Sequence, residues 1–377
     1  MNGRSEEFRE IAHSGGKVTI QVRTDPQKGR YGMLRWENSR PNAAAVFSIY
    51  ALFPGVPVAT AVLGGLGSPA YPEPVPGSIH VMIGSDSEGL FGRLCPSCNG
   101  YWRSNVPSGV CPYCGVPGEA HHFLTVAQQA YVHEFCVLHQ KAASSMKDGD
   151  YVIDFDALAD VAAKEVEKPP FYLTEKSQQN KFKCSACRSV TDVLGKFGYC
   201  TSCGTRNDLQ ELEAKTLGDL RVRINAGGPY EACVRDAVSA FDSFVGQYVK
   251  ELVSHVPMTS GRRNRLGGRF HNLEAVAAEF RETFDIRILD GIDSADQAFA
   301  MRMFYRRHVY EHNGGEADEK YIAQSGDQDV RPKQALHETR ESAHNIVSLV
   351  GRMAKNLHNG FHELFPPNPN RIRRSSS

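Results

Sequence analysis

Apolar and polar residues alternate with a period of two along the first part of the chain. Such alternation is typical of half-buried β-strands, because successive side chains point to opposite faces of a sheet. The runs that show it lie at residues 17–24 and 78–83, and the apolar runs at residues 46–53 and 58–63 between them are predicted to be paired strands. We therefore predict a β-rich N-terminal domain over residues 1–91.

One stretch of this domain, residues 43–72, carries no charged side chain and is long enough to span a bilayer. The prolines and glycine at residues 54–57 interrupt its middle, where a membrane helix would have to continue. A hairpin loop explains the glycine-rich run at residues 64–67 better than a phosphate-binding loop does. We expect paired strands here and no membrane contact.

The period changes to 3.6 residues after Leu209, which is typical of amphipathic helices. Four long helices are predicted, at residues 230–255, 273–288, 294–312 and 333–364. The third begins at Ser294-Ala295-Asp296-Gln297, which has the form of a capping box, and ends at the stop signal Asn313-Gly314-Gly315. Their lengths and short connections indicate a helical bundle.

Two further helices are expected before residue 209. One covers residues 123–143, with Leu124 and Leu138 on its apolar face, and a shorter one covers residues 154–166. Cys136 and Cys233 fall within apolar helical patterns, so we assign both to the core and not to a site.

Charge alone does not identify a partner. The chain has 43 Lys plus Arg and 43 Asp plus Glu, so its net charge requires neither a nucleic acid nor a membrane surface. Local basic patches lie around residues 176–196, at residues 262–265 and at residues 371–374. A solvated surface explains any single patch as well as a binding site does.

Eight of the ten cysteines form a pattern that occurs twice. In each copy a Cys-x-x-Cys turn is followed, after twelve residues, by a second Cys-x-x-Cys turn and a glycine. The first set is Cys95, Cys98, Cys111 and Cys114, and the second is Cys184, Cys187, Cys200 and Cys203. Zinc prefers four such thiolates in a tetrahedron, so the sequence predicts two zinc ribbons. Both ions are predicted to be structural, because four cysteines leave no open coordination position.

Disulfides are the competing interpretation of these cysteines. They need an oxidising compartment, but the N-terminus shows no apolar signal region, and we expect a cytoplasmic protein. Redox motifs of the thioredoxin type use one Cys-x-x-Cys turn and not matched pairs. Because sixty-nine residues separate Cys114 from Cys184, we expect two separate ribbons and not an interleaved double site.

These patterns together predict an α+β multidomain chain. After the β-rich domain come a first ribbon with its helix at 92–145, a connecting segment at 146–179, a second ribbon at 180–208, the helical bundle at 220–367 and a disordered basic tail at 368–377. The sequence contains no Walker A motif, HExxH motif or dinucleotide fingerprint, so no small-molecule cofactor is expected.

Candidate chemistry lies at the end of the third long helix, in Arg307-His308-Val309-Tyr310-Glu311-His312. An arginine, a polar residue, three other residues and a histidine, carried by a helical bundle, resemble the motif of the HEPN family of ribonucleases and nucleotide-binding modules. The resemblance covers about residues 220–365. It implies a four-helix HEPN-like bundle with RNA as its partner.

The resemblance also implies the roles of individual residues. His312 is the expected base or acid, Arg307 the clamp on the phosphoryl oxygens, and His308 and Asn313 the orienting groups. A neutral histidine removes the ribose 2′-OH proton, and the 2′-oxygen then forms a 2′,3′-cyclic phosphate without a metal. The arginine stabilises the charge that grows on the phosphoryl oxygens.

In the family two such motifs meet across a dimer. This chain has one good copy, so the resemblance implies a homodimer that pairs through the bundle. Bacterial toxins and antiphage defence proteins have a similar architecture, which is an analogy of context and not of residues.

Arginine and histidine at nearly this spacing also occur elsewhere, at Arg265–His271, Arg302–His308, Arg306–His312, Arg331–His337 and Arg352–His358. The helix and the Asn-Gly-Gly stop favour Arg307–His312, and a pair of surface residues stays the alternative. Two other functions stay open. A non-catalytic protein would bind RNA or DNA in a salt-sensitive way without cleaving it. An interaction scaffold would neither bind nor cleave nucleic acid.

Overall fold

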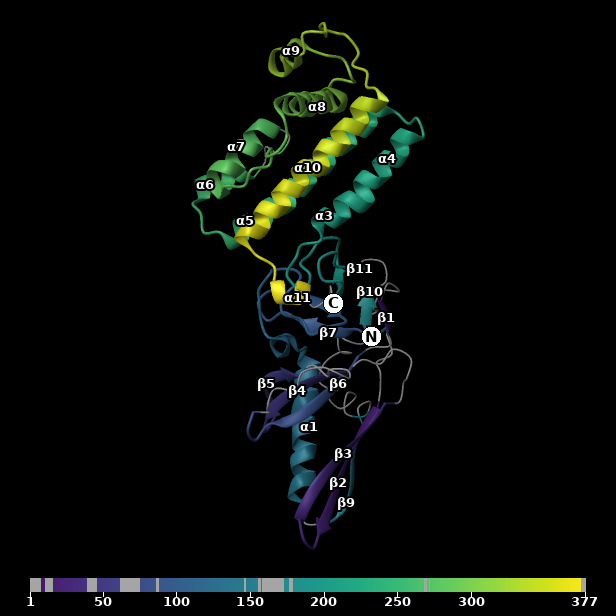
Figure 1. The fold of residues 1–377 in the computed structure, drawn as a ribbon, viewed down its shortest axis with the longest axis vertical. Helices are drawn as coiled ribbons and strands as arrows, with labels where there is room; N and C mark the ends of the chain where they lie inside the picture. The colour runs from purple at the N-terminus through teal and green to yellow at the C-terminus, as the bar shows by residue number, and fades with distance from the viewer. Residues whose placement is uncertain are drawn as a thin grey trace, which may run out of the picture. The chain divides into compact units, whose positions relative to one another are not determined.

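The computed structural model describes residues 8–10, 16–38, 46–61, 75–85, 88–145, 147–154, 157, 173–175, 179–267, 270 and 272–373. Two compact units divide the chain: Met1–Thr205 together with Asn368–Ser377, and Arg206–Pro367. The first is built on β-sheets and contains both cysteine clusters, and the second is helical (Figure 1). The predicted mixed α+β class is confirmed.

Two three-stranded antiparallel sheets contain the predicted N-terminal strands. One has the order β5-β4-β6, with β4 at Val46–Leu52, β5 at Val56–Ala61 and β6 at Ile79–Gly84. The other has the order β3-β2-β9, with β2 at Gly16–Asp25, β3 at Gly29–Asn38 and β9 at Gly149–Asp154. Every second residue of β6 is buried, as the period of two predicts. Strand β9 comes from the segment 146–179, so the β-rich part of the chain extends beyond residue 91.

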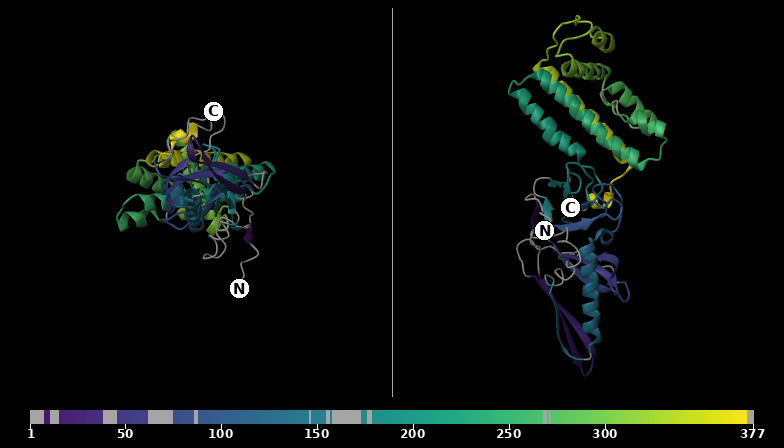
Figure 2. Two further views of the ribbon diagram at one scale, coloured as in Figure 1. Left: turned by 90° about the horizontal axis from the view of Figure 1, so that it is seen from below. Right: turned by 180° about the vertical axis from the view of Figure 1, so that it is seen from behind.

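Helix α1 (Val126–Ser144) packs against strands of both sheets (Figure 2). It begins three residues after the predicted start because Thr125 caps it. The Thr125 hydroxyl accepts a hydrogen bond from the Gln128 backbone, and the Gln128 amide oxygen accepts one from the Thr125 backbone. Phe135 is buried against the sheets, but the prediction for Leu138 is wrong, because this side chain is 38% exposed.

The strands of the two cysteine segments form one sheet. Its order is β11-β12-β8-β7, with β7 at Phe91–Leu94, β8 at Tyr101–Ser104, β11 at Gln179–Lys183 and β12 at Val190–Leu194. Strand β12 pairs with β8, and a buried ion pair between Arg103 and Asp192 joins the two segments at this contact. The ribbons are therefore separate as cysteine clusters but share a sheet. A further short pair joins β1 (Phe8–Glu10) to β10 (Leu173–Glu175).

Long and short helices make up the described part of the second unit. They are α3 (Asp208–Glu211), the π-helical turn η3 (Leu212–Thr216), α4 (Leu217–Asn225), α5 (Tyr230–His255), α6 (Ser260–Leu266), α7 (Leu273–Phe284), α8 (Ser294–His312), α9 (Glu319–Ser325) and α10 (Arg340–Leu364). Helices α5 and α10 pack along each other, α4 contacts both of them, and α8 packs against α5, α7 and α10 (Figure 1).

The predicted helices differ from the observed ones mainly at their ends. Helix α8 begins as predicted, but its N-cap is Asp293 and not Ser294, since the Asp293 carboxylate accepts from the backbone of Asp296. Helix α10 begins at Arg340 and not near residue 333, because Thr339 caps it. The helical stretch from Asp208 to Asn225 is absent from the prediction.

The C-terminal tail is partly ordered, contrary to prediction. Helix α11 covers Pro369–Arg373, the Asn368 backbone N–H donates to the Cys203 carbonyl, and Ile372 packs against the second cysteine cluster. Most of the helix predicted at 154–166 and the glycine run at 64–67 lie outside the described residues. Among the helices of the described ranges, none is long and apolar enough to cross a membrane.

Candidate functional site

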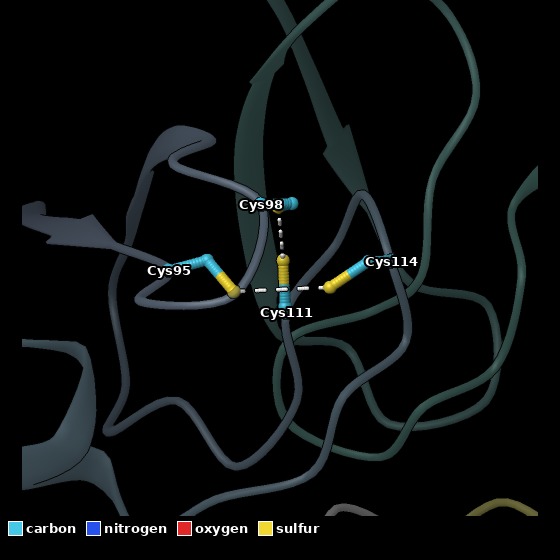
Figure 3. A group of neighbouring side chains, drawn as sticks. All are labelled: Cys95, Cys98, Cys111 and Cys114. Carbon is cyan, nitrogen blue, oxygen red and sulfur yellow. Dashed lines mark hydrogen bonds between the residues drawn. The ribbon is translucent and has the colours of Figure 1, made fainter.

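The first cysteine cluster brings together the four predicted sulfur atoms (Figure 3). Cys95 Sγ lies 3.7 Å from Cys114 Sγ, and Cys98 Sγ lies 3.7 Å from Cys111 Sγ. Tetrahedral zinc with Zn–S bonds of about 2.3 Å holds its sulfurs about 3.8 Å apart. The cluster therefore has the geometry that a zinc ion requires.

The second cluster repeats this arrangement in a more buried setting. Cys184 Sγ lies 3.7 Å from Cys203 Sγ, and Cys187 Sγ lies 3.4 Å from Cys200 Sγ. All four cysteines are buried. Disulfide sulfurs would lie about 2.05 Å apart, so these are free thiols arranged around a common centre. The two clusters fit two structural zinc ions.

The backbone at the four turns explains why these short sequences form ligand sites. In each turn the residue after the second cysteine has a positive φ and donates its N–H to the carbonyl of the first cysteine. The φ values are 56° at Asn99, 68° at Gly115, 62° at Arg188 and 83° at Gly204. The two predicted glycines thus occupy left-handed positions, where a residue without Cβ is unstrained.

Backbone N–H groups also favour the thiolate form that zinc binds. Burial opposes ionisation of the Cys95 thiol, but the N–H groups of Cys98 and Ser97 point at its sulfur and hold its pKa below the ordinary value. Cys136 and Cys233 are fully buried in the cores of their units, as predicted. Burial raises the pKa of Cys136 to about 11, which keeps it an inert thiol.

The structure separates the side chains of Arg307 and His312. Residues five apart on a helix point in directions about 140° apart, given 3.6 residues per turn. Arg307 leans toward α5, where its Nε donates to Ser239 Oγ at 3.4 Å, and its side chain is 21% exposed. His312 is exposed at the last residue of α8.

His308 and His312 lie together, because they are four residues apart on α8. Their ring centroids are 4.7 Å apart, and both side chains are exposed. Partial burial first, and then the nearby positive charge of His312, Lys320 and Arg307, lowers the pKa of His308. A neutral imidazole is therefore available at neutral pH beside a second histidine.

Asn313 is the C-cap residue of α8. Its side-chain amide donates to Asp318 Oδ2 at 2.9 Å, and Asp318 in turn caps α9. Through this hydrogen bond, Asn313 positions the loop between α8 and α9. Lys320 and Asp318 border a pocket of about 190 Å³ next to His308.

Asp242 is a site residue that the sequence analysis missed. Its Oδ2 lies 3.9 Å from Nη2 of Arg307, and its Oδ1 is buried without a hydrogen-bond partner in the described part of the chain. Burial raises the pKa of Asp242 to about 6, although the charge of Arg307 acts in the opposite direction. Buried titratable groups with such shifts concentrate at functional sites.

Asp242 belongs to a recognisable pattern of polar residues in α5. Arg235, Ser239 and Asp242 recur at steps of four and three residues beside the apolar face of this helix, so they form one polar stripe. The stripe faces α8, where Arg235 lies 3.8 Å from Glu311 and the other two residues contact Arg307. Such a stripe inside a helix with ten buried residues is a sequence signal for a polar contact between helices.

Among the other arginine–histidine pairs, Arg306 has a structural role. Its guanidinium donates to Asp327 at 2.8 Å, to Glu338 at 3.0 Å and to Tyr321 at 3.0 Å. These contacts fasten α9 and the loop before α10 to α8. His358 is largely buried with its Nδ1 2.6 Å from the Tyr248 hydroxyl, and burial lowers its pKa to about 3. Both residues belong to the packing of the helical unit.

Because the Asp242 carboxyl is buried, we expect its ionisation to lower the free energy of unfolding in a pH-dependent way. Its folded pKa of about 6 lies above the ordinary value of 3.8, so wild-type stability should fall as the pH rises from about 4 through 6. Asp242→Asn should therefore raise the free energy of unfolding at pH 8 by about 1–3 kcal/mol and give little gain at pH 4. Urea unfolding at several pH values measures this difference.

Asp236 supplies the control for that experiment. It lies on the same helix and pairs with Arg223 at 2.8 Å, so Asp236→Asn removes an ion pair and should give no gain at pH 8. A stability difference for Asp242→Asn that is the same at every pH would contradict the buried, ionised carboxyl.

Comparison with protein-family models, with curated proteins and with solved structures finds no match to this chain in any of the three.

Proposed function

We propose that the helical unit is a HEPN-like endoribonuclease that cleaves RNA without a metal ion. The observation that supports this most is the pair of exposed histidines, His308 and His312, one helical turn apart on the helix that also carries Arg307. Helices α5, α7, α8 and α10 correspond to the four predicted helices, and the contacts of α8 with the other three support the proposed bundle. The cysteine clusters are closed sites and take no part in the reaction.

In the proposed reaction His312 of one chain acts as the base, and His312 of a second chain acts as the acid. His312 removes the proton of a ribose 2′-OH, and the 2′-oxygen forms a bond to the adjacent phosphorus. The bond to the 5′-oxygen breaks, and that oxygen receives a proton from the acid. The products are a 2′,3′-cyclic phosphate and a 5′-OH. Arg307 stabilises the charge on the phosphoryl oxygens, and Asp242 positions Arg307.

The divergence of Arg307 and His312 around α8 supports a site shared by two chains. In one copy of the motif the side chains of the arginine and the histidine point in different directions. Two copies that meet across a two-fold axis provide an acid and a base together. We expect a dimer that pairs near His312. Light scattering should give the mass of two chains, and a monomer at every concentration, with and without RNA, would contradict the shared site.

RNA incubated with the purified protein in EDTA tests the activity itself. Fragments should appear with wild-type protein and not with His312→Ala protein purified in the same way, which controls for contaminating nucleases. Salt-sensitive binding without fragments would indicate a nucleic-acid-binding protein, and neither binding nor cleavage would indicate a scaffold.

A further inference from the structure

A second concave site lies in the helical unit, apart from the histidine pair. It is a pocket of about 460 Å³ between α6 and α7, and Gly267 and Phe270 also line it. Its floor contains the buried side chains of Leu266, Val276 and Phe280, and its rim contains Asn264 and Arg265. An apolar floor with a few polar groups at the rim is typical of a pocket for a flat organic group.

Phe270 forms an aromatic wall of this pocket. The ring is half-buried and lies against α5 at Gly246, where an added Cβ would stand 3.5 Å from the ring atom Cε2. The ring is therefore supported from behind by the helix backbone. Glu279, which also lines the pocket, offers a carboxylate to hydrogen-bond donors of a bound group.

Helix α6 carries three arginines, and one of them, Arg265, lines the pocket. Arg262, Arg263 and Arg265 fall within the seven residues of α6, and all three are exposed. Two other exposed arginines of this unit have carboxylates nearby: Arg281 lies 4.0 Å from Glu282, and Arg287 lies 3.5 Å from Asp285. Like charges this close on one short helix are unfavourable by themselves and favour an anionic partner.

We propose that this pocket binds one unpaired nucleotide of single-stranded RNA. The base stacks on Phe270, Asn264 and Glu279 offer hydrogen bonds to its edge, and the three arginines of α6 contact the neighbouring phosphates. A base must leave its stack to enter a pocket of this size, so the site selects single strands over duplexes. This inference rests on the proposed ribonuclease function and assigns the helical unit a substrate-holding site.

The test is a binding titration with the full-length chain carrying His312→Ala, which leaves the RNA uncut. The probe is a fluorescein-labelled single-stranded RNA of about twelve nucleotides, a length within the range that such grooves bind. Replacing Arg262, Arg263 and Arg265 by glutamine should weaken binding at least about tenfold. The plot of log affinity against log salt should become shallower, with the magnitude of its slope smaller by about 2, because three phosphate contacts are lost.

The aromatic contact has its own variants. Phe270→Ala should weaken binding about tenfold or more without changing the salt slope, since stacking does not release counterions. Phe270→Tyr keeps a stacking ring and should restore the affinity, which separates stacking from a folding defect. The matched control replaces Arg281 and Arg287 by glutamine and should leave the affinity unchanged. An unlabelled duplex of the same sequence should compete poorly.

The outcomes separate the two proposals. If wild-type protein cuts RNA but the α6 and Phe270 variants bind as tightly as the control, the pocket assignment is wrong and the ribonuclease proposal stands. If the variants weaken binding as expected but wild-type protein cuts no RNA, the pocket stands without the cleavage chemistry. No measurable RNA binding by any form would overturn the pocket assignment.

Discussion

His312→Ala is expected to lower RNA cleavage by about a hundredfold or more, the usual effect of losing a general acid or base. Arg307→Ala should have a similar effect, because the phosphoryl charge loses its partner. Neither change should unfold the chain, since His312 is exposed and the side chain of Arg307 contacts the polar stripe of α5. Initial rates of cleavage, together with thermal unfolding of each variant, measure both effects.

Arg331 and His337 provide a matched control with nearly the same spacing. Both are exposed, and the side chain of His337 is 82% exposed, so replacing either by alanine should leave the cleavage rate near wild type. His358 is unsuitable as a control because its burial against Tyr248 makes it part of the core. If Arg331→Ala and Arg307→Ala lowered the cleavage rate equally, the assigned pair would have no special role.

Cys200→Ser is expected to release zinc from the second cluster and to destabilise the first unit by several kcal/mol. Cys200 is fully buried, and the binding energy of a structural zinc ion is largely folding energy. Elemental analysis should give about two zinc ions per wild-type chain and about one per variant chain. Cleavage should decline only as far as the protein unfolds.

Cys136→Ala controls for the loss of a buried thiol in the same unit. Cys136 lies in the apolar core against the sheets, so the zinc content should stay at about two per chain. A wild-type zinc content near zero, in protein purified under reducing conditions, would contradict both metal sites.

The local patterns of the sequence predict the cysteine clusters and the longest helices well. Zinc ligands are set by spacing within about twenty residues, and the structure brings together each set of four as predicted. Helix α5 has the predicted bounds because its apolar residues recur at a strict helical period. Helix ends are less predictable, since Asp293 and Thr339 cap helices through side-chain hydrogen bonds that neighbouring polar residues could equally make.

The features that the sequence does not predict depend on contacts between distant segments. The pairing of β8 with β12 joins residues about ninety positions apart, and the pairing of β2 with β9 spans an even longer separation. Asp242 becomes a site residue only because α8 packs against α5. The separation of Arg307 from His312 follows from helix geometry, but the partners of Arg307 on α5 are fixed by tertiary packing.

The chemistry of the RNA ends tests the central claim most directly. Fragments produced by wild-type protein in EDTA should carry 2′,3′-cyclic phosphate and 5′-OH ends, which mass spectrometry distinguishes by the loss of one water from a terminal phosphate. An RNA with 2′-O-methyl groups throughout should stay intact, because the nucleophile is blocked. Fragments with 5′-phosphate ends, or cleavage that survives His312→Ala and disappears with EDTA, would contradict the account.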